Sequence, residues 1–463
     1  MSKTPMHSFQ TGRTRSSTPV LDKFTIIPVL ACSYPTIVGP LMDFASSPAS
    51  TLESASEPGL INRLFWPAMA AISVVLAMGS RSRRGKLTFP FHIICLFAYL
   101  AFAGASILWA FSPEDSLVRF TQQVMIITSI VVPAMMAGRT ADLMWGLFLC
   151  FALGAILNLF FIVGSPPPIL EKSSGYTGYF SNKNYLGEFS AVACLLAFNE
   201  VSYPGLRRLL GILVLMLAAL LVYLGNSKTA LGLVLLVPIL ARLALLVRSI
   251  TRISPAILLW SIVFCYAVLS RVSNFNSNRL SFMLYGDSTF TGRTVIWDFA
   301  NLMMEARPLL GWGYQSFWWV GADGPSMSAP GWIKNMPNAH NGYYDTMLEM
   351  GYVGLALLLM FITATLHASG RVADRDPAHA RVLLSLALYI VLYNFLESFW
   401  MRGFEFVWLM FVVVAAETGR YFQPTALQRA PYGSRVPMPG RGPGFAKQAT
   451  HPMHRSPTSG QRP

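Results

Sequence analysis

Several polar stretches between long apolar runs carry side chains suited to phosphate chemistry. Lys228 stands in the short turn LGNSKTALG and Arg293 in TGRTVIW. His340 stands in PNAHNGYYD. Guanidinium and ammonium groups that point at one place suit a diphosphate, and an imidazole beside them can take a proton from an attacking hydroxyl. We interpret His340, Arg293 and Lys228 as candidate catalytic residues, provided that the fold brings them together.

Other polar side chains in the same stretches are candidates for holding a substrate. Asparagine amides can bind sugar hydroxyls or fix the tautomer of a neighbouring histidine. The candidate substrate-binding residues are Asn182, Lys183, Arg279, Tyr314, Asn338 and Asn341.

Each of these side chains also has a structural interpretation. A lone lysine at the end of an apolar run commonly extends its charge to the membrane interface. A lone histidine is often a structural hydrogen-bonding group. We expect most of the five tryptophans near His340 to form an interfacial belt, with a sugar-stacking platform as the alternative. They are Trp297, Trp312, Trp318, Trp319 and Trp332.

Residues 271–350 form the only long interval without an apolar run of membrane-spanning length. A connection of about 80 residues is far longer than an ordinary loop and indicates a function of its own. We predict a lid or cap over a membrane domain, carrying part of the active site.

The composition indicates an integral membrane protein. Hydrophobic residues make up 54% of the chain and charged residues 12%, about half the charged fraction of a soluble globular protein. The net charge of +14 is expected to mark the cytoplasmic face and not a nucleic-acid partner. The five cysteines all fall in apolar runs, so neither disulfides nor a metal cluster are expected.

Apolar runs of about 20 residues are long enough to cross a bilayer. The sequence predicts an all-α polytopic integral membrane protein with about 12 transmembrane helices and one long periplasmic loop. The predicted spans are residues 24–42, 60–79, 88–111, 119–138, 143–164, 186–201, 209–225, 230–247, 255–271, 351–368, 381–398 and 404–419. Proline residues interrupt the first span and Arg63 lies in the second, so ten or eleven spans are the alternative.

The loops between the spans predict an orientation. The run Arg81, Arg83, Arg84 and Lys86 and most other basic loop residues fall on one side, whereas Glu53, Glu57, Glu114 and Asp115 fall on the other. Basic loops face the cytoplasm. We therefore expect both termini in the cytoplasm and residues 271–350 on the outer side, which in a bacterium is the periplasmic side of the inner membrane.

The expected organisation has five parts. Residues 1–23 form a cytoplasmic tail, 24–270 carry nine spans, 271–350 form the periplasmic loop with the catalytic motifs, and 351–419 carry three spans. Residues 420–463 are rich in Pro, Gly, Ser and Arg, and we expect a disordered basic tail attracted to anionic lipid.

Four stretches together resemble the O-antigen ligase/polymerase superfamily of bacterial inner-membrane glycosyltransferases. They are GYFSNKNYLGEF, LGNSKTALGL, TGRTVIWDFA followed by RPLLGWGYQSF, and PNAHNGYYDTMLEMGYVGL, within residues 174–356. The resemblance implies that Arg293 engages a donor diphosphate and that His340 activates the acceptor hydroxyl. Lys228 stands where ligases of the family typically carry arginine. Lysine keeps the positive charge but cannot form the bidentate hydrogen bonds of a guanidinium.

The resemblance implies a metal-independent transfer of glycan from a polyprenyl-diphosphate-linked donor, such as an undecaprenyl diphosphate, to a saccharide acceptor. Within the family, SNKNYLG and SKTAL are most similar to exopolysaccharide polymerases of the ExoQ type, and O-antigen ligase is the alternative. Expected partners are the donor, the acceptor, membrane lipids and other polysaccharide assembly proteins. No cofactor or nucleic acid is expected, because no GxxxxGK[ST] or DxD-like motif serves the outer face.

A transporter or flippase with twelve spans is the alternative from a different class. Such a protein should show internal repeats and charged or broken helices near the membrane midplane. A scaffold of a polysaccharide assembly complex is a further alternative, in which His340 would be dispensable.

Overall fold

The computed structural model describes residues 20–45, 60–84, 87–138, 141–164, 170–171, 175–273, 279, 282–283, 292–403 and 405–424. Most of the predicted cytoplasmic tails, and residues 274–278, 280–281 and 284–291 of the predicted periplasmic loop, lie outside the described residues. The structural statements below concern residues before 430, which form one compact unit.

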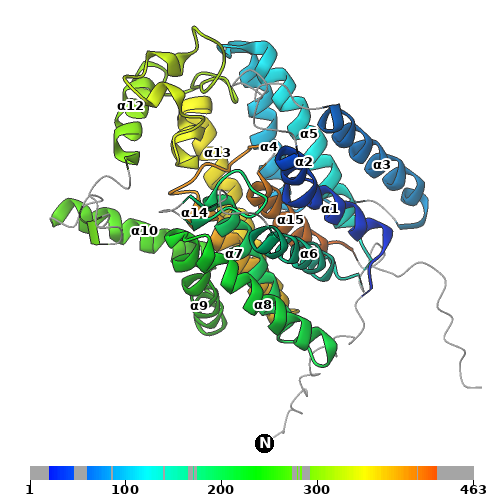
Figure 1. Cartoon of the computed structure of the whole chain (residues 1–463). Coiled ribbons are helices and arrows are strands. Elements are labelled where there is room, and N and C mark those ends of the chain that lie inside the picture. The colour runs from blue at the N-terminus through cyan, green and yellow to red at the C-terminus, as the bar shows by residue number, and fades with distance from the viewer. Residues whose placement is uncertain are drawn as a thin grey trace, which may run out of the picture. The chain divides into compact units, whose positions relative to one another are not determined.

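The described chain is almost entirely helical (Figure 1). Its only strand pair is β1 (Leu170–Glu171) with β2 (Gly175–Tyr176), among the described residues. The helices are α1 (Lys23–Ser33), η1 (Tyr34–Val38), α2 (Gly39–Ala45), α3 (Leu60–Arg84), α4 (Phe91–Ala105), η2 (Ser106–Trp109), α5 (Pro113–Met136), α6 (Leu143–Gly164), α7 (Lys183–Glu200), α8 (Leu206–Leu224), α9 (Lys228–Thr251), α10 (Pro255–Val272), α12 (Arg293–Ala306), η4 (Pro325–Ser328), η5 (Ile333–Asn335), α13 (Gly342–Val372), α14 (Pro377–Tyr393) and α15 (Phe406–Tyr421).

Nine helical segments of the described chain are long and apolar enough to cross a membrane. Each of the twelve predicted spans overlaps a helix, but α7, α14 and α15 do not meet both requirements. The last two have only 17 and 16 residues. Helix α15 is buried along its length and packs against α5, α13 and α14. It is therefore covered by protein and not by lipid.

The first predicted span changes its helical form at its prolines. Pro35 lies within the π-helical turn η1, which separates α1 from α2. Because proline has no backbone N–H, the regular hydrogen-bond ladder cannot continue through it. The three pieces still form one continuous candidate span, Lys23–Phe44.

Residues 292–341, which we call the cap, have a hydrophobic core of their own. Ile296 and Phe299 of α12 pack with Phe317, Trp318 and Ile333 from the chain that follows. Three of the five tryptophans considered for an interfacial belt belong to this core. Trp297, Trp312 and Trp318 are built into the cap, and each donates its indole N–H to a protein oxygen.

Helix α13 is broken at Gly351, whose φ of 63° and ψ of −166° are not helical. An added Cβ there would lie 2.2 Å from the carbonyl oxygen of Leu309, so only glycine lets the cap chain approach. The freed carbonyls of Leu348 and Glu349 accept hydrogen bonds from Trp312 N and Gly313 N, both at 2.8 Å. These hydrogen bonds, which the break makes possible, connect the cap to the first part of α13.

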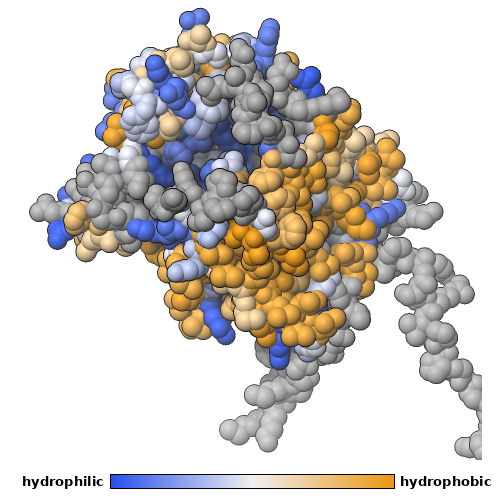
Figure 2. Space-filling view, viewed as in Figure 1, coloured by the Kyte–Doolittle hydropathy of each residue, from blue (hydrophilic) through white to orange (hydrophobic). Residues whose placement is uncertain are grey.

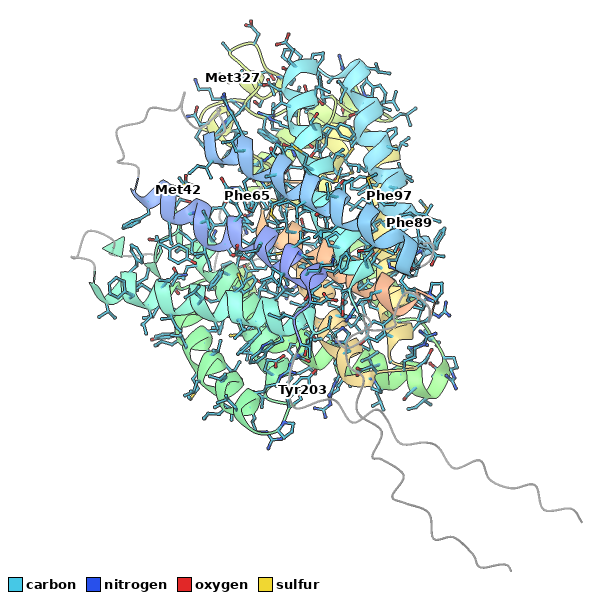
Figure 3. All side chains as sticks on the ribbon, turned by 90° about the vertical axis from the view of Figure 1, so that its right-hand side faces the viewer. Met42, Phe65, Phe89, Phe97, Tyr203 and Met327 are labelled. Atoms are coloured by element: carbon cyan, nitrogen blue, oxygen red, sulfur yellow. The ribbon has the colours of Figure 1, made fainter. Side chains whose placement is uncertain are left out.

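The opposite end of the bundle is held together by ion pairs whose arginines are largely buried. Arg207 Nη1 lies 2.9 Å from Asp142 Oδ2, and Arg248 Nη2 lies 2.7 Å from Asp374 Oδ2. Figure 3 places Met327 of the cap and Tyr203, which follows α7, at opposite ends of the bundle. Figure 2 shows hydrophobic residues over the middle of one face and hydrophilic residues gathered near the cap. This distribution fits a membrane protein with one large polar end.

Candidate active site

The carboxylate of Glu397 is the point where the cap meets the helix bundle. Arg293 Nη2 donates to Glu397 Oε1 at 2.6 Å, and His340 Nδ1 donates to Glu397 Oε2 at 2.9 Å. Asn184 Nδ2 donates to Oε1 at 3.3 Å from the first turn of α7. The side chains of Glu397, Arg293 and His340 are 11%, 13% and 29% exposed. The group is thus shielded from bulk water, with its imidazole the most accessible member.

The bond to Glu397 decides which nitrogen of His340 carries a proton. An ionised carboxylate only accepts hydrogen bonds, so Nδ1 of the imidazole must be the donor. In the neutral ring, Nε2 then has a free lone pair. The same carboxylate would stabilise the imidazolium formed when Nε2 takes up a proton. This arrangement can serve general base catalysis.

The backbone around His340 is held in an unusual turn. His340 has φ of 49°, in the left-handed region that few residues other than glycine adopt. Its N–H donates to Asn338 Oδ1 at 2.9 Å. Asn341 caps α13, because its side chain accepts from Tyr343 N and Tyr344 N. Positive φ at a non-glycine residue persists only when its surroundings enforce it, as the two asparagines do here.

The segment between α14 and α15 holds this turn from the other side. Gly342 N donates to the carbonyl oxygens of Asn394 and Glu397, both at 2.9 Å. Asn341 N donates to Ser398 Oγ at 2.9 Å. A Cβ at Gly342 would lie 2.3 Å from Asn394 Oδ1. The backbone contacts therefore fix the separation between Glu397 and His340.

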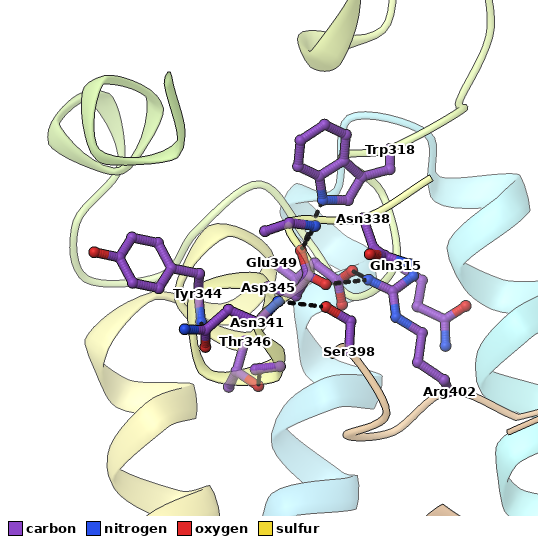
Figure 4. A network of polar contacts seen from close by, with 12 residues as sticks. Gln315, Trp318, Asn338, Asn341, Tyr344, Asp345, Thr346, Glu349, Ser398 and Arg402 are labelled. Atoms are coloured by element: carbon purple, nitrogen blue, oxygen red, sulfur yellow. Dashed lines mark hydrogen bonds and ion pairs between the residues drawn. The ribbon is translucent and has the colours of Figure 1, made fainter. Parts of the chain in front are cut away.

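A second charged network lies behind the His340 turn (Figure 4). Arg402 Nη2 lies 3.1 Å from Asp345 Oδ2 and 3.0 Å from Glu349 Oε1. Asp345 Oδ1 accepts from Trp318 Nε1 at 2.8 Å and from Ala339 N at 3.0 Å. Burial alone would lower the pKa of Arg402, but the facing carboxylates of Glu349 and Asp345 raise it above its usual value. Through Asp345, this network connects Ala339, the residue before His340, to Trp318 of the cap and to Arg402.

A fourth carboxylate, Glu405, lies just before the first residue of α15. Tyr185 Oη donates to Glu405 Oε1 at 3.0 Å. Burial raises the pKa of Glu405 to about 7, against the hydrogen bond from Tyr185 and the charge of Arg402, which lower it. Nearby Glu188 of α7 is buried, and its Oε2 has no hydrogen-bond partner among the described residues. The site thus has more carboxylates than the sequence motifs indicated.

Three cationic residues begin helices at this end of the bundle. Lys183, Lys228 and Arg293 are the first residues of α7, α9 and α12. A helix N-terminus has a partial positive charge and prefers an anion. Placing a cation there is unfavourable unless an anion compensates. A bound diphosphate would provide that compensation, as phosphates do at many helix N-termini.

Two comparisons with known proteins bear on this site. A family model described as O-Antigen ligase matches residues 212–359. The chain is also similar to the exopolysaccharide production protein ExoQ of Rhizobium meliloti (strain 1021). The two are 28% identical over 374 residues, which cover 74% of this chain and 84% of the relative.

These matches support an O-antigen ligase/ExoQ-like family. The resemblance inferred from the motifs is confirmed. The family match contains Lys228, Arg293 and His340, whereas Glu397 lies beyond its last residue. Glu397 is therefore a candidate site residue outside the part of the chain that the family model matches.

The structure brings together only some of the predicted site residues. His340 and Arg293 share the carboxylate of Glu397. Lys228 is exposed and has no ion-pair partner among the described residues. It directly follows Ser227, which packs against Gly187 of α7. Arg279 is exposed, and the residues on either side of it lie outside the described part of the chain.

Four of the predicted substrate-binding residues make hydrogen bonds within the protein. Tyr314 is fully buried, and its Oη donates to Met401 O at 2.7 Å. Asn182 caps α7 by accepting from Tyr185 N at 3.1 Å. Asn338 and Asn341 shape the His340 turn. These four side chains therefore stabilise the local structure. Lys183, also in the predicted set, is partly exposed at the first turn of α7.

The sequence analysis missed Glu397, Asn184, Arg402 and Glu405. Two of these carboxylates fell inside the predicted spans 381–398 and 404–419. An ionisable residue within a predicted span is by default a candidate functional residue, so the stretch NFLESFWMRGFE contained a usable signal. Among the described residues, no group of three or more His, Cys, Asp or Glu side chains could hold a metal ion.

Proposed function

We propose that the chain is a membrane glycosyltransferase that joins a polyprenyl-diphosphate-linked glycan to a sugar hydroxyl, and that it polymerises exopolysaccharide repeat units. The single observation that carries this proposal is the Glu397 carboxylate, which holds His340 and Arg293 at 2.9 and 2.6 Å. A base oriented by a carboxylate next to a guanidinium suits transfer from a diphosphate.

In the proposed reaction the acceptor hydroxyl oxygen attacks the anomeric carbon of the donor glycan. The bond from that carbon to the diphosphate oxygen breaks, and its electron pair leaves with the diphosphate. The hydroxyl proton passes to Nε2 of His340, and Glu397 stabilises the resulting imidazolium. The base must lie within hydrogen-bond reach of the hydroxyl, which the exposed fraction of His340 permits.

Arg293 and Lys228 supply the positive charge that stabilises the leaving diphosphate. Arginine has five N–H donors, and the bond to Glu397 uses one of them. The remaining donors can bind two diphosphate oxygens while Glu397 stays in place. Electrostatic stabilisation of developing charge is usually a large part of catalysis, and in this proposal protein cations supply it without a metal or nucleotide.

The relative named as an exopolysaccharide production protein favours the polymerase, and the family model described as O-Antigen ligase favours transfer to lipid A-core. The glycans of a deletion strain distinguish the two. Single repeat units should accumulate if the chain is a polymerase. Loss of glycan-capped lipid A-core would mean a ligase, and an unchanged surface glycan would contradict both functions.

A further inference from the structure

A groove of about 690 Å³ lies at the end of the bundle opposite Glu397. Its walls come from the start of α4, the start of α10, the second half of α13 and Phe422. The lining residue His367 lies 25 residues beyond Gly342 along α13, which corresponds to roughly 37 Å of helix. The groove is therefore separate from the candidate active site, and its volume is typical of a ligand site.

One end of the groove is polar and cationic. His367 Nδ1 lies 3.1 Å from Ser254 Oγ, and Ser254 caps the N-terminus of α10. Arg371 stands one turn beyond His367 on the same face of α13. Its guanidinium carbon lies 5.2 Å from the ring centre of Phe422. Arg371 is exposed and has no carboxylate partner among the described residues, and no carboxylate lines the groove.

The rest of the groove is apolar and faces outward. Trp260 Nε1 donates to Thr363 Oγ1 at 2.9 Å, so the polar atoms of both side chains are already paired. Ile257 is 57% exposed and Phe91 is 65% exposed. Both belong to helices long and apolar enough to cross the membrane. The groove therefore opens toward lipid along its length, with Arg371 and His367 at its polar end.

We propose that this groove binds one anionic phospholipid, with its phosphate at Arg371 and an acyl chain along Trp260 and Met360. Charge complementarity argues for this occupant. A neutral chain would leave Arg371 without an anion, and a free phosphate would leave the apolar walls uncovered. Basic pockets between helices near the membrane surface are known sites for anionic headgroups. The N-termini of α4 and α10 add partial positive charge at the same end.

Native mass spectrometry of the purified full chain tests the site with phosphatidylglycerol and phosphatidylcholine. The parent should retain one phosphatidylglycerol and exchange phosphatidylcholine readily. Arg371→Gln should lower the affinity for phosphatidylglycerol about tenfold or more, since a charge-assisted hydrogen bond is lost. Arg252→Gln is the matched control, because Arg252 is exposed at the end of α9 and does not line the groove. It should bind as the parent does.

A second variant tests the apolar part without changing charge. Ala364→Phe places a ring in the groove and should also reduce binding of phosphatidylglycerol. Circular dichroism checks that both variants fold. Equal retention of the two lipids by the parent, or unchanged retention by Arg371→Gln, would overturn the proposal. So would equal thermal stabilisation by inorganic phosphate alone, because the acyl chain would then contribute nothing.

Discussion

At the scale of single residues, Glu397 joins an acid–base group to an anion-binding group. One carboxylate oxygen accepts from Arg293 and the other from His340. Removing one partner of a buried charged pair leaves the other uncompensated and is costly. The position and charge of Arg293 and His340 therefore depend on Glu397. We expect that replacing Glu397 lowers the rate of glycan transfer although it does not itself take the proton.

We predict that Glu397→Gln lowers kcat by about 10²–10⁴-fold, the usual size of a general base contribution. The glutamine amide can donate to His340 Nδ1, which would place the ring proton on Nε2 and remove the base. Steady-state kinetics with a lipid-linked donor measures this effect. Glu305→Gln on the exposed face of α12 is the control and should keep the parent rate. A fully active Glu397→Gln enzyme would contradict the orienting role.

Arg293→Lys should weaken transition-state stabilisation by about 1.5–3 kcal/mol, because lysine keeps the charge but loses the planar fork. Lys228→Arg should be far better tolerated, since the resembled ligases carry arginine there. Donor binding and kcat of both variants provide the measurement. Near-normal turnover of a well-expressed Arg293→Lys protein would argue against the diphosphate clamp.

The sequence motifs contained His340 and Arg293, whereas the only sequence signal for Glu397 was its charge within a predicted span. Glu397 is 57 residues from His340, 104 from Arg293 and 213 from Asn184 along the chain. Local motifs carry no information about such distant pairs. The sequence also carried no sign that Tyr314 is buried and donates its hydroxyl to the distant Met401 carbonyl oxygen.

At the scale of elements, the N-terminus of α15 is tied to α7 by the contact between Tyr185 and Glu405. Burial raises the pKa of Glu405 from 4.5 to about 7. The folded state therefore binds a proton that the unfolded chain releases between these pH values. By linkage, the stability from the protonated carboxyl is fully present below about pH 4.5 and is lost as the pH rises to about 7.

We predict that Glu405→Gln removes this pH dependence. The stability of the parent relative to the variant should fall between about pH 4.5 and pH 7 and then level off. Thermal unfolding of both proteins in detergent across this range measures the difference. Parallel Tm curves for the two proteins would show that Glu405 does not titrate with a raised pKa.

Hydropathy predicted the positions of the helices, but it did not predict which helices are enclosed by protein. All twelve predicted segments overlap helices, because apolar runs of this length rarely form anything else in a membrane protein. The short α14 and α15 are enclosed by other helices, and hydropathy does not distinguish a lipid-facing helix from an enclosed one. The cap core was also not foreseen, since three tryptophans expected at the interface pack within it.

At the scale of the whole molecule, the cap and Glu397 lie at one end and the groove of Arg371 at the other. The loop charges predict that the cap end is periplasmic and that both termini are cytoplasmic. Phosphatase fused after Thr425 should be inactive and β-galactosidase fused there active. Strong phosphatase activity at that position would overturn the orientation and place the site on the wrong side for a periplasmic donor.

The most direct test of the central claim is glycan transfer by purified parent and His340→Gln proteins, with a lipid-linked repeat unit and excess chelator. The parent should form polymer without added metal. His340→Gln should lower kcat by about 10²–10⁴-fold while donor affinity stays near the parent value, because Arg293 and Lys228 hold the diphosphate. A His340→Gln protein that keeps the full rate and the same pH profile would contradict the account.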